Sequence, residues 1–181
     1  MQKTTGNSRR YKGKLTGYGK AIPKTVVTNH DLAARMDTSD EWIRERTGIE
    51  RRHVVRDDEH CSDLATQASQ KAMDKAGITA DEVDLIIVAT NSPDYLTPPV
   101  SSQVQHNLGA HNAGAFAMVV GCSGFVYALV TADQFMRSGQ YRNIIVVGVE
   151  VASRNVDWND RNTCVLFGDG AAAIVLQQSE V

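Results

Sequence analysis

Three nearly unbroken apolar runs constrain the fold of this 181-residue chain more than any other feature. They are VDLIIVAT (83–90), AFAMVV (115–120) and NIIVVGV (143–149). Runs of this kind and length are typical of strands that are buried on both faces of a parallel sheet. Segments with the helical spacing of small and apolar residues precede or separate them, namely 62–76, 101–108 and 125–137. Strands that alternate with helices predict an α/β fold with a mixed, mostly parallel sheet.

Weaker signals extend this pattern toward both ends. We expect a strand at 13–22 that Pro23 closes, a helix capped by Thr28 or Asn29, and extended chain at 49–55. A second helix is expected to begin near Ser39 and to end at Gly48, and a last strand is expected at 171–176. We also expect the helices 62–76 and 125–137 to cover the same face of the sheet, which leaves the other face exposed.

Composition excludes several classes of function. The net charge of −2 gives no basic field for nucleic acid, and the basic residues near the start indicate a solvated tail at 1–13, before a domain at 14–181. No apolar run approaches the roughly 18 residues of a membrane span, and no signal peptide opens the chain. Three cysteines form no disulfide framework. These observations predict a soluble cytoplasmic protein that binds neither nucleic acid nor membrane.

The chemically most informative segment is VVGCSGFVYAL, at 119–129. A strand there delivers Cys122 to the start of a long helix, and Gly121 and Gly124 permit a tight turn and close approach of a ligand. The unpaired N–H groups of a helix start favour a thiolate and can hold a thioester oxyanion. Cys122 is therefore a candidate nucleophile, with a buried packing cysteine as the alternative.

The other cysteines and the histidines give weaker signals. Cys61 precedes a helix without the strand-to-helix corner, and Cys164 lies in an apolar stretch that favours a packing role. No Cys-x-x-Cys, His-x-x-x-His or His-x-Glu pair provides the spacing of metal ligands. We therefore predict no metal site and no resident cofactor.

Four segments resemble the β-ketoacyl-acyl carrier protein synthase III family of thiolase-like condensing enzymes. They are DTSDEWIRERTGI (37–49), LIIVATNS (85–92), GCSGFVYAL (121–129) and DWNDRNTCVLFGDGAAAIVL (157–176). They occur in the order and with the spacing of the family, and the resemblance extends over nearly all of the chain after Lys14. The resemblance implies the first half of a thiolase-like five-layer αβαβα fold.

The same resemblance implies roles for individual residues. Cys122 matches the nucleophile that receives an acyl group from acyl-CoA. Trp42 and Arg161 match the pair that sandwiches the adenine of CoA, a role that suits an indole face and a planar guanidinium. Thr38 and Arg46 match residues that line the entrance for the nucleotide and its phosphates.

Thr97 matches a position that the family supplies from a partner subunit to the tip of the acyl pocket. A small residue there implies room for a primer longer than acetyl. By analogy with thiolase-like proteins, we expect a homodimer in which the strand 143–149 pairs with its twin.

The implied reaction condenses an acyl-CoA primer with malonyl-acyl carrier protein to give 3-oxoacyl-acyl carrier protein in fatty acid biosynthesis. Family members are about twice as long, and their second half carries the catalytic His and Asn, so the full reaction is expected to need such a half. Phe116-Ala117-Met118 also departs from the FDV pattern common in the family. Two alternatives stay open, a non-catalytic or truncated half-subunit that only dimerises, and a related condensing enzyme with another acceptor.

Overall fold

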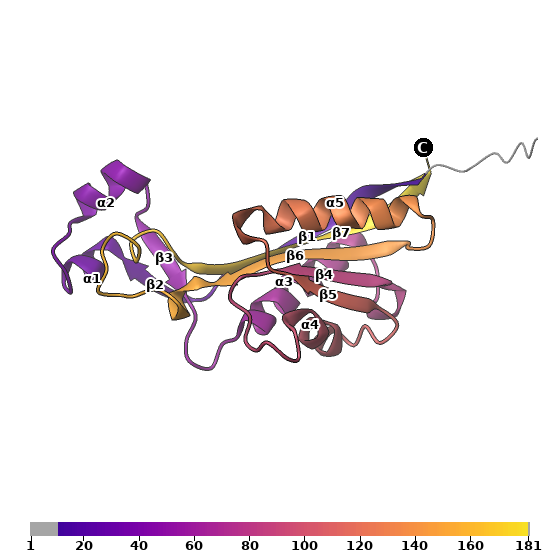
Figure 1. The fold of residues 1–181 in the computed structure, drawn as a ribbon, viewed down its shortest axis with the longest axis horizontal. Helices are drawn as coiled ribbons and strands as arrows, with labels where there is room; N and C mark the ends of the chain where they lie inside the picture. Colours follow the sequence, from indigo (N-terminus) through magenta and orange to yellow (C-terminus); the bar gives the residue numbers. More distant parts are fainter. Residues whose placement is uncertain (1–10, 181) are drawn as a thin grey trace, which may run out of the picture.

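The core of the protein is a five-stranded sheet with the order β1-β7-β6-β4-β5 (Figure 1). The computed structural model describes residues 11–180. The strands are β1 (Tyr11–Ala21), β4 (Leu85–Ala89), β5 (Gly114–Met118), β6 (Asn143–Val151) and β7 (Asp169–Glu180). The pairs β4–β5 and β4–β6 are parallel, whereas β1–β7 and β6–β7 are antiparallel. The sheet is mixed, as predicted, with two pairs of each kind rather than mostly parallel ones.

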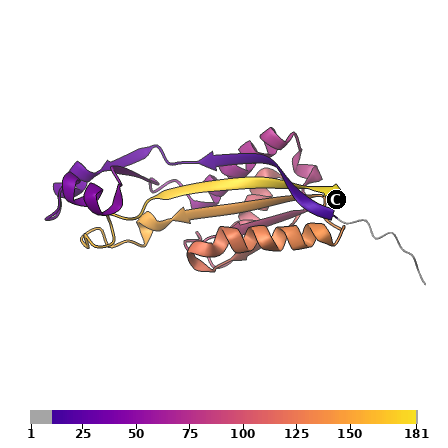
Figure 2. The ribbon, with the colours of Figure 1, turned by 90° about the horizontal axis from the view of Figure 1, so that it is seen from above.

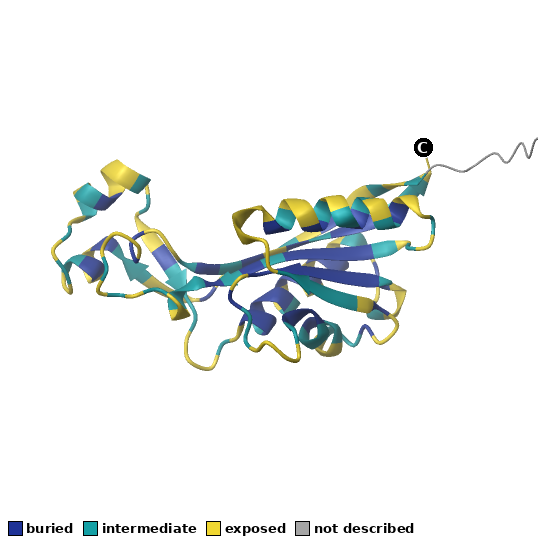
Figure 3. Cartoon of the chain, in the orientation of Figure 1, coloured by how far each residue is buried: buried dark blue, intermediate teal, exposed yellow. Residues whose placement is uncertain are grey.

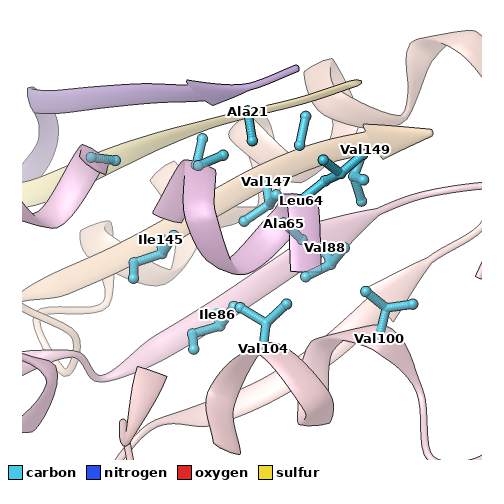
Figure 4. Packing of buried hydrophobic residues seen from close by; sticks show 14 of the residues in the cluster. Ala21, Leu64, Ala65, Ile86, Val88, Val100, Val104, Ile145, Val147 and Val149 are labelled. Carbon is cyan, nitrogen blue, oxygen red and sulfur yellow. The ribbon is translucent and has the colours of Figure 1, made fainter. Parts of the chain in front are cut away.

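The helices cover both faces of this sheet. Helices α3 (Cys61–Ala76) and α4 (Val100–Leu108) pack on one face, where the alternate residues Ile86, Val88, Ile145 and Val147 belong to their core (Figure 4). Helix α5 (Gly124–Arg137) lies on the opposite face, against Leu85, Ile87, Ile144, Val146 and Leu176. The expectation that 62–76 and 125–137 share one face is therefore wrong. Apolar residues at both alternating positions of β4 and β6 are the direct consequence of this two-sided cover.

Strand β1 approaches the backbone of α3 unusually closely. A Cβ atom on Gly17 would lie 2.1 Å from the carbonyl oxygen of Ala72, and one on Gly19 would lie 2.3 Å from that of Ala68. Only glycine on the strand leaves room for this contact, because the atoms nearest to each position are backbone carbonyl oxygens of α3. Gly17 and Gly19 thus allow the strand to pack directly against the backbone of the helix.

A smaller part of the protein extends beyond one end of the sheet (Figure 2). It contains the hairpin of β2 (Thr25–Thr28) and β3 (Arg51–Val54), with helices α1 (Asn29–Ala33) and α2 (Asp40–Thr47) between them. The predicted caps are confirmed, with Thr28 at the start of α1 and Ser39 at the start of α2. The strand β2 was not predicted. A separate cluster that includes Leu32, Ile43 and Cys164 forms the interior of this part.

A buried arginine joins this part to the chain that follows β6. Arg52 is 4% exposed, and its guanidinium donates to the carbonyl oxygens of Val27 and Val165 and to the amide oxygen of Asn29. Burial lowers the pKa of Arg52 below its usual value. The segment 152–168, which contains the turn Ala152–Arg154, is thereby held against the β2–β3 hairpin.

Strand β6 is hydrogen-bonded on both sides, to β4 and to β7. It has no free edge, so the predicted dimer contact through strand 143–149 is wrong. An apolar strand reads the same in the sequence whether it lies at the centre or at the edge of a sheet. The edges are β1 and β5, and β5 is only partly buried rather than buried on both faces.

Most boundaries of the predicted segments agree with the structure within about two residues, but the last strand, predicted at 171–176, extends over Asp169–Glu180. The buried residues are concentrated in the sheet and the helix faces that cover it (Figure 3). The remaining short turn, Ala80–Glu82, leads into β4. Of the predicted tail at 1–13, residues 1–10 lie outside the described residues, and 11–13 belong to β1. Within residues 11–180, none of the helices is both long and apolar enough to cross a membrane.

Candidate active site

Cys122 lies at the corner between β5 and α5, as the sequence predicts. It occupies the middle of a single 3₁₀ turn, Gly121–Ser123, which continues directly into α5. Gly121 has a φ of +67°, a conformation that favours glycine. A Cβ on Gly124 would be 3.0 Å from that of Ala89, so α5 begins in close contact with β4. This corner presents an exposed thiol next to the first backbone N–H groups of a 14-residue helix.

Cys122 opens into a cleft of about 550 Å³. One side of the cleft consists of polar residues at the ends of β4 and β6, among them Asn91, Ser92 and Glu150. The other side is part of the segment 152–168 and includes Val156, Leu166 and Phe167 among its apolar residues. A smaller hollow of about 270 Å³ adjoins Cys122 and is lined largely by glycine, at Gly121, Gly124, Gly148, Gly168 and Gly170. The thiol is therefore accessible to a ligand that has both polar and apolar parts.

The polar side of the cleft is a connected set of hydrogen bonds. One oxygen of Glu150 accepts from the backbone N–H and the side-chain amide of Asn91, at 2.9 and 2.7 Å. The other oxygen accepts from the hydroxyl of Ser92 at 2.6 Å. The amide oxygen of Asn91 in turn accepts from the backbone N–H of Gly121 at 3.1 Å.

Three predicted binding residues come together at α2. The guanidinium carbon of Arg46 is 4.4 Å from the centre of the Trp42 ring, and that of Arg161 is 5.1 Å from it. Arg161 also donates to the backbone carbonyl oxygen of Asp37 at 2.6 Å. A base inserted between the Trp42 ring and the Arg161 guanidinium would make two stacking contacts. The ring and the guanidinium would then be about 7 Å apart, since carbon atoms in contact are 3.5–4.0 Å apart. Arg161 therefore occupies the space in which a base would stack on Trp42.

The two predicted threonines lie in different surroundings. Thr38 precedes α2, and its hydroxyl is buried without a hydrogen-bond partner among residues 11–180. Thr97 is exposed in the loop between β4 and α4 and is not among the residues that line the cleft at Cys122. The structure thus groups Trp42, Arg46 and Arg161, and it separates Thr97 from the cleft within one chain.

The other two thiols are not accessible. Burial raises the pKa of Cys61 to about 12, and its Sγ lies 3.7 Å from the hydroxyl of Thr90. Burial also raises the pKa of Cys164, which packs against Met36. These environments agree with the packing roles that the sequence favours for both cysteines.

Sequence reasoning did not identify Asn91, Ser92, Glu150 or Asp169. Asp169 is 7% exposed and accepts from the backbone N–H groups of Val55 and Ser153. Asn91 and Ser92 follow β4, Glu150 lies near the end of β6, and Asp169 begins the antiparallel β7. These positions beside apolar strands are the signal that could have found them. Polar residues there converge on one edge of the sheet.

Comparisons with known proteins place this geometry in a class. The structure superposes on the crystal structure of 3-oxoacyl-[acyl-carrier-protein] synthase III from Aquifex aeolicus VF5 with a TM-score of 0.91 and 47% identity. That match covers 93% of this chain and 55% of the other. The priming β-ketosynthase of the R1128 polyketide pathway matches with a TM-score of 0.93 and 36% identity, over 98% and 53%. The fold is thus one half of a thiolase-like condensing enzyme.

The sequence comparisons identify a more specific group of similar proteins. The profile of 3-oxoacyl-[acyl-carrier-protein (ACP)] synthase III matches residues 114–181. The β-ketoacyl-[acyl-carrier-protein] synthases III of Xanthomonas campestris pv. campestris (strain 8004) and Ehrlichia canis (strain Jake) are 53% and 54% identical, over 96% and 91% of this chain. In sequence and fold, the chain corresponds to the N-terminal portion of β-ketoacyl-acyl carrier protein synthase III. It spans about half the length of the curated relatives that it matches, 53% and 52% for these two.

Proposed function

We propose that this chain provides the acyl-accepting half of a β-ketoacyl-acyl carrier protein synthase III of fatty acid biosynthesis. The observation that carries the proposal is the exposed Cys122 at a strand-to-helix corner, inside a cleft of about 550 Å³. The segment 152–168 both lines that cleft and presents Arg161 to Trp42. One extended ligand, bound by its nucleotide at Trp42, can therefore follow this segment to the thiol.

The first half-reaction transfers an acyl group to Cys122. The thiolate attacks the thioester carbonyl of acyl-CoA, and the oxyanion that forms is held by backbone N–H groups at the start of α5. The intermediate collapses, the carbon–sulfur bond to CoA breaks, and CoA leaves as its thiolate. An acyl-cysteine remains.

The second half-reaction forms the carbon–carbon bond. Malonyl-acyl carrier protein loses carbon dioxide, and the electron pair of the broken bond gives an enolate. The enolate carbon attacks the acyl-cysteine carbonyl and expels the Cys122 thiolate, which leaves 3-oxoacyl-acyl carrier protein. Donors for the enolate oxygen are the His and Asn that the resemblance assigns to a second half. These substrates are cytoplasmic metabolites, so we place the reaction in the cytoplasm.

The nucleotide end of CoA binds between Trp42 and Arg161, with Arg46 and Thr38 at the entrance. Because Arg161 already lies 5.1 Å from the centre of the Trp42 ring, it has to move outward before adenine can enter. Its hydrogen bond to the Asp37 carbonyl is the contact that this movement breaks.

The outer face of α5 is where we place the second half. Val126, Tyr127 and Val130 are 55–60% exposed on that face, directly after the Cys122 corner. Relatives of about twice this length provide the chain that can cover them. Thr97, exposed and apart from the cleft of its own chain, is left to act in the acyl pocket of a partner subunit of the homodimer.

Mass spectrometry of the chain after incubation with acyl-CoA tests the proposal. We expect one acyl group on Cys122, and none in Cys122→Ala, which keeps the corner but lacks the nucleophile. Formation of 3-oxoacyl-acyl carrier protein is expected only after addition of a second half that carries His and Asn. Equal acylation of the Cys122→Ala variant would contradict the assignment of the nucleophile.

The physiological acceptor is a separate question, because the priming enzyme of a polyketide pathway matches the fold as well as the fatty acid enzyme does. We favour the acyl carrier protein of fatty acid synthesis, since the relatives of highest identity reported above carry that name. Turnover of the reconstituted enzyme with fatty acid and polyketide carrier proteins, compared at equal concentration, distinguishes the two.

A further inference from the structure

Glu150 is the charged side chain that lines both hollows beside Cys122. It is half-buried near the end of β6, and both of its carboxylate oxygens accept hydrogen bonds. Its partners Asn91 and Ser92 lie two and three residues after Ala89, the last residue of the neighbouring strand β4. The carboxylate therefore links the ends of two parallel strands at the edge of the sheet where Cys122 lies.

The hydrogen bonds of Glu150 determine how the Asn91 amide is oriented. A carboxylate only accepts hydrogen bonds, so the NH₂ group of Asn91 has to face Glu150, at 2.7 Å. The amide oxygen of Asn91 consequently faces the other way, toward the backbone N–H of Gly121 at 3.1 Å. An amide turned by half a rotation would place two donors against each other at Gly121.

Ser92 adds a second link of the same kind. Its hydroxyl donates to Glu150 at 2.6 Å and accepts from the backbone N–H of Val151 at 2.7 Å. This closes a ring between the ends of β4 and β6 and limits the rotamers of Glu150. The carboxylate is thus itself held in place before it orients Asn91.

Gly121 is the residue through which this set of contacts reaches the thiol. It immediately precedes Cys122 and has the positive φ of +67° that turns the chain from β5 into α5. The hydrogen bond from Gly121 N–H to Asn91 is the contact that ties this turn to the end of β4.

We propose that Glu150 is a positioning residue for the nucleophile, acting through Asn91 on the Gly121–Cys122 turn. A charge-assisted hydrogen bond is roughly twice as strong as a neutral one, so a carboxylate fixes the amide more firmly than a neutral acceptor does. The inference rests on the proposed function for its catalytic meaning. The geometry that it describes can be tested without any acyl transfer.

Amide exchange at Gly121 is the direct measurement. The chain contains 14 glycines, so a ¹⁵N-glycine-labelled sample gives a simple spectrum, and the Gly121→Ala variant identifies the Gly121 signal. We expect Glu150→Ala to speed the exchange of Gly121 roughly tenfold, the effect of losing one hydrogen bond to a well-oriented partner. Exchange at Gly19, in the β1–β7 ladder, should stay as in the unchanged protein.

Alkylation of Cys122 by iodoacetamide is the second measurement on the same proteins. Glu150→Ala should slow it roughly tenfold, because the thiol is no longer held in one orientation. Glu150→Asp retains a carboxylate and should recover part of both effects. Asp74→Asn removes an acid from the last turn of α3 and serves as the matched control.

Asn91→Ala gives the same test if Glu150→Ala does not fold, because Asn91 is exposed and its side chain is the direct acceptor for Gly121. Unchanged exchange at Gly121 in a folded Glu150→Ala or Asn91→Ala protein would overturn the proposal. Faster exchange with unchanged alkylation would also overturn it, since the turn would then not position the thiol. If both predicted effects occur but acyl-CoA does not acylate Cys122, the result would support the positioning role of Glu150. It would then contradict only the proposed function.

Discussion

The three cysteines differ in their surroundings in the way that their sequence contexts suggest. Cys122 is exposed at a helix start, whereas Cys61 and Cys164 are each 0% exposed. Reaction with iodoacetamide requires an accessible thiolate. At the scale of single residues, this difference leads to a direct chemical test.

We expect iodoacetamide at neutral pH to label Cys122 first, and Cys61 and Cys164 only when the protein unfolds. A pKa of about 12 leaves almost no thiolate at Cys61 near neutrality, in addition to its burial. Peptide mapping after a short labelling time measures this, and labelling in denaturant provides the control for equal intrinsic reactivity. Comparable labelling of Cys61 in the folded chain would argue against the corner as the reactive site.

Trp42 and Arg161 provide the second prediction at this scale. We expect CoA to quench indole fluorescence, and Trp42→Ala or Arg161→Ala each to weaken CoA binding by about 1–2 kcal/mol if stacking dominates. The second indole, Trp158, donates to the carbonyl oxygen of Ser153 and lies in the same segment as Arg161. The titration is therefore repeated in Trp158→Phe. If both alanine variants bind CoA with the affinity of the parent, adenine does not stack between Trp42 and Arg161.

Among the elements, the contact between β1 and α3 is the least tolerant of change. A methyl group on Gly19 would meet the Ala68 carbonyl oxygen at 2.3 Å, a backbone atom that cannot turn aside. We expect Gly19→Ala to lower the free energy of unfolding by about 1–3 kcal/mol or more. Chemical denaturation measures this loss.

Gly13→Ala is the matched control in the same strand. Its new methyl group would meet the side chain of Leu176 at 3.3 Å, a contact that a flexible group can relieve. We expect a much smaller loss of stability for this variant. If Gly13→Ala and Gly19→Ala lower the free energy of unfolding equally, strand propensity rather than the close approach to α3 determines the loss of stability.

The sequence predicts well where the helices and strands lie along the chain, but it predicts poorly which of them are neighbours in space. Periodicity and caps locate α3, α5 and the buried strands within a few residues, because these signals are local. The side of the sheet that α5 covers and the central place of β6 depend on pairings between distant segments, which no local pattern records. The four-residue β2 was missed because it is too short to establish a period.

The same distinction applies to the site. Cys122 was found from the residues around it, and its partners Trp42 and Arg161 were identified through the resemblance to the family. Glu150 and Asn91 were missed because they lie 59 positions apart in the sequence and meet only when β4 and β6 pair. In the sequence alone, a single polar residue after an apolar strand indicates the start of a loop rather than a functional site.

At the scale of the whole molecule, the exposed face of α5 is the feature with the largest consequence. Val126, Tyr127 and Val130 adjoin the exposed Val119 and Val120 along the chain. An apolar surface of this kind favours association. We therefore expect the 181-residue chain alone to form dimers or larger aggregates.

The double variant Val126→Glu/Val130→Glu tests this expectation by light scattering. It should associate less than the parent when it is expressed alone. It should also lose the gain in solubility and condensation activity that co-expression with a second half gives the parent. Asp133→Glu/Arg137→Lys keeps the charges of a neighbouring ion pair on α5 and serves as the control. A parent chain that is monodisperse, monomeric and fully active would contradict both the proposed α5 interface and the need for a second half.

Strand β1 pairs with β7 from Tyr11↔Glu180 to Ala21↔Ala171, so its ladder joins the two ends of the described chain. On a ribosome, β1 emerges before β7 and waits for it for on the order of ten seconds, at typical rates of elongation. Helix α3 emerges early in that interval, and its backbone is the surface against which Gly17 and Gly19 pack in the folded protein. We therefore expect the close contact between β1 and α3 to give the nascent strand a place to dock, which would shield it from other chains until its hydrogen-bonding partner has been translated.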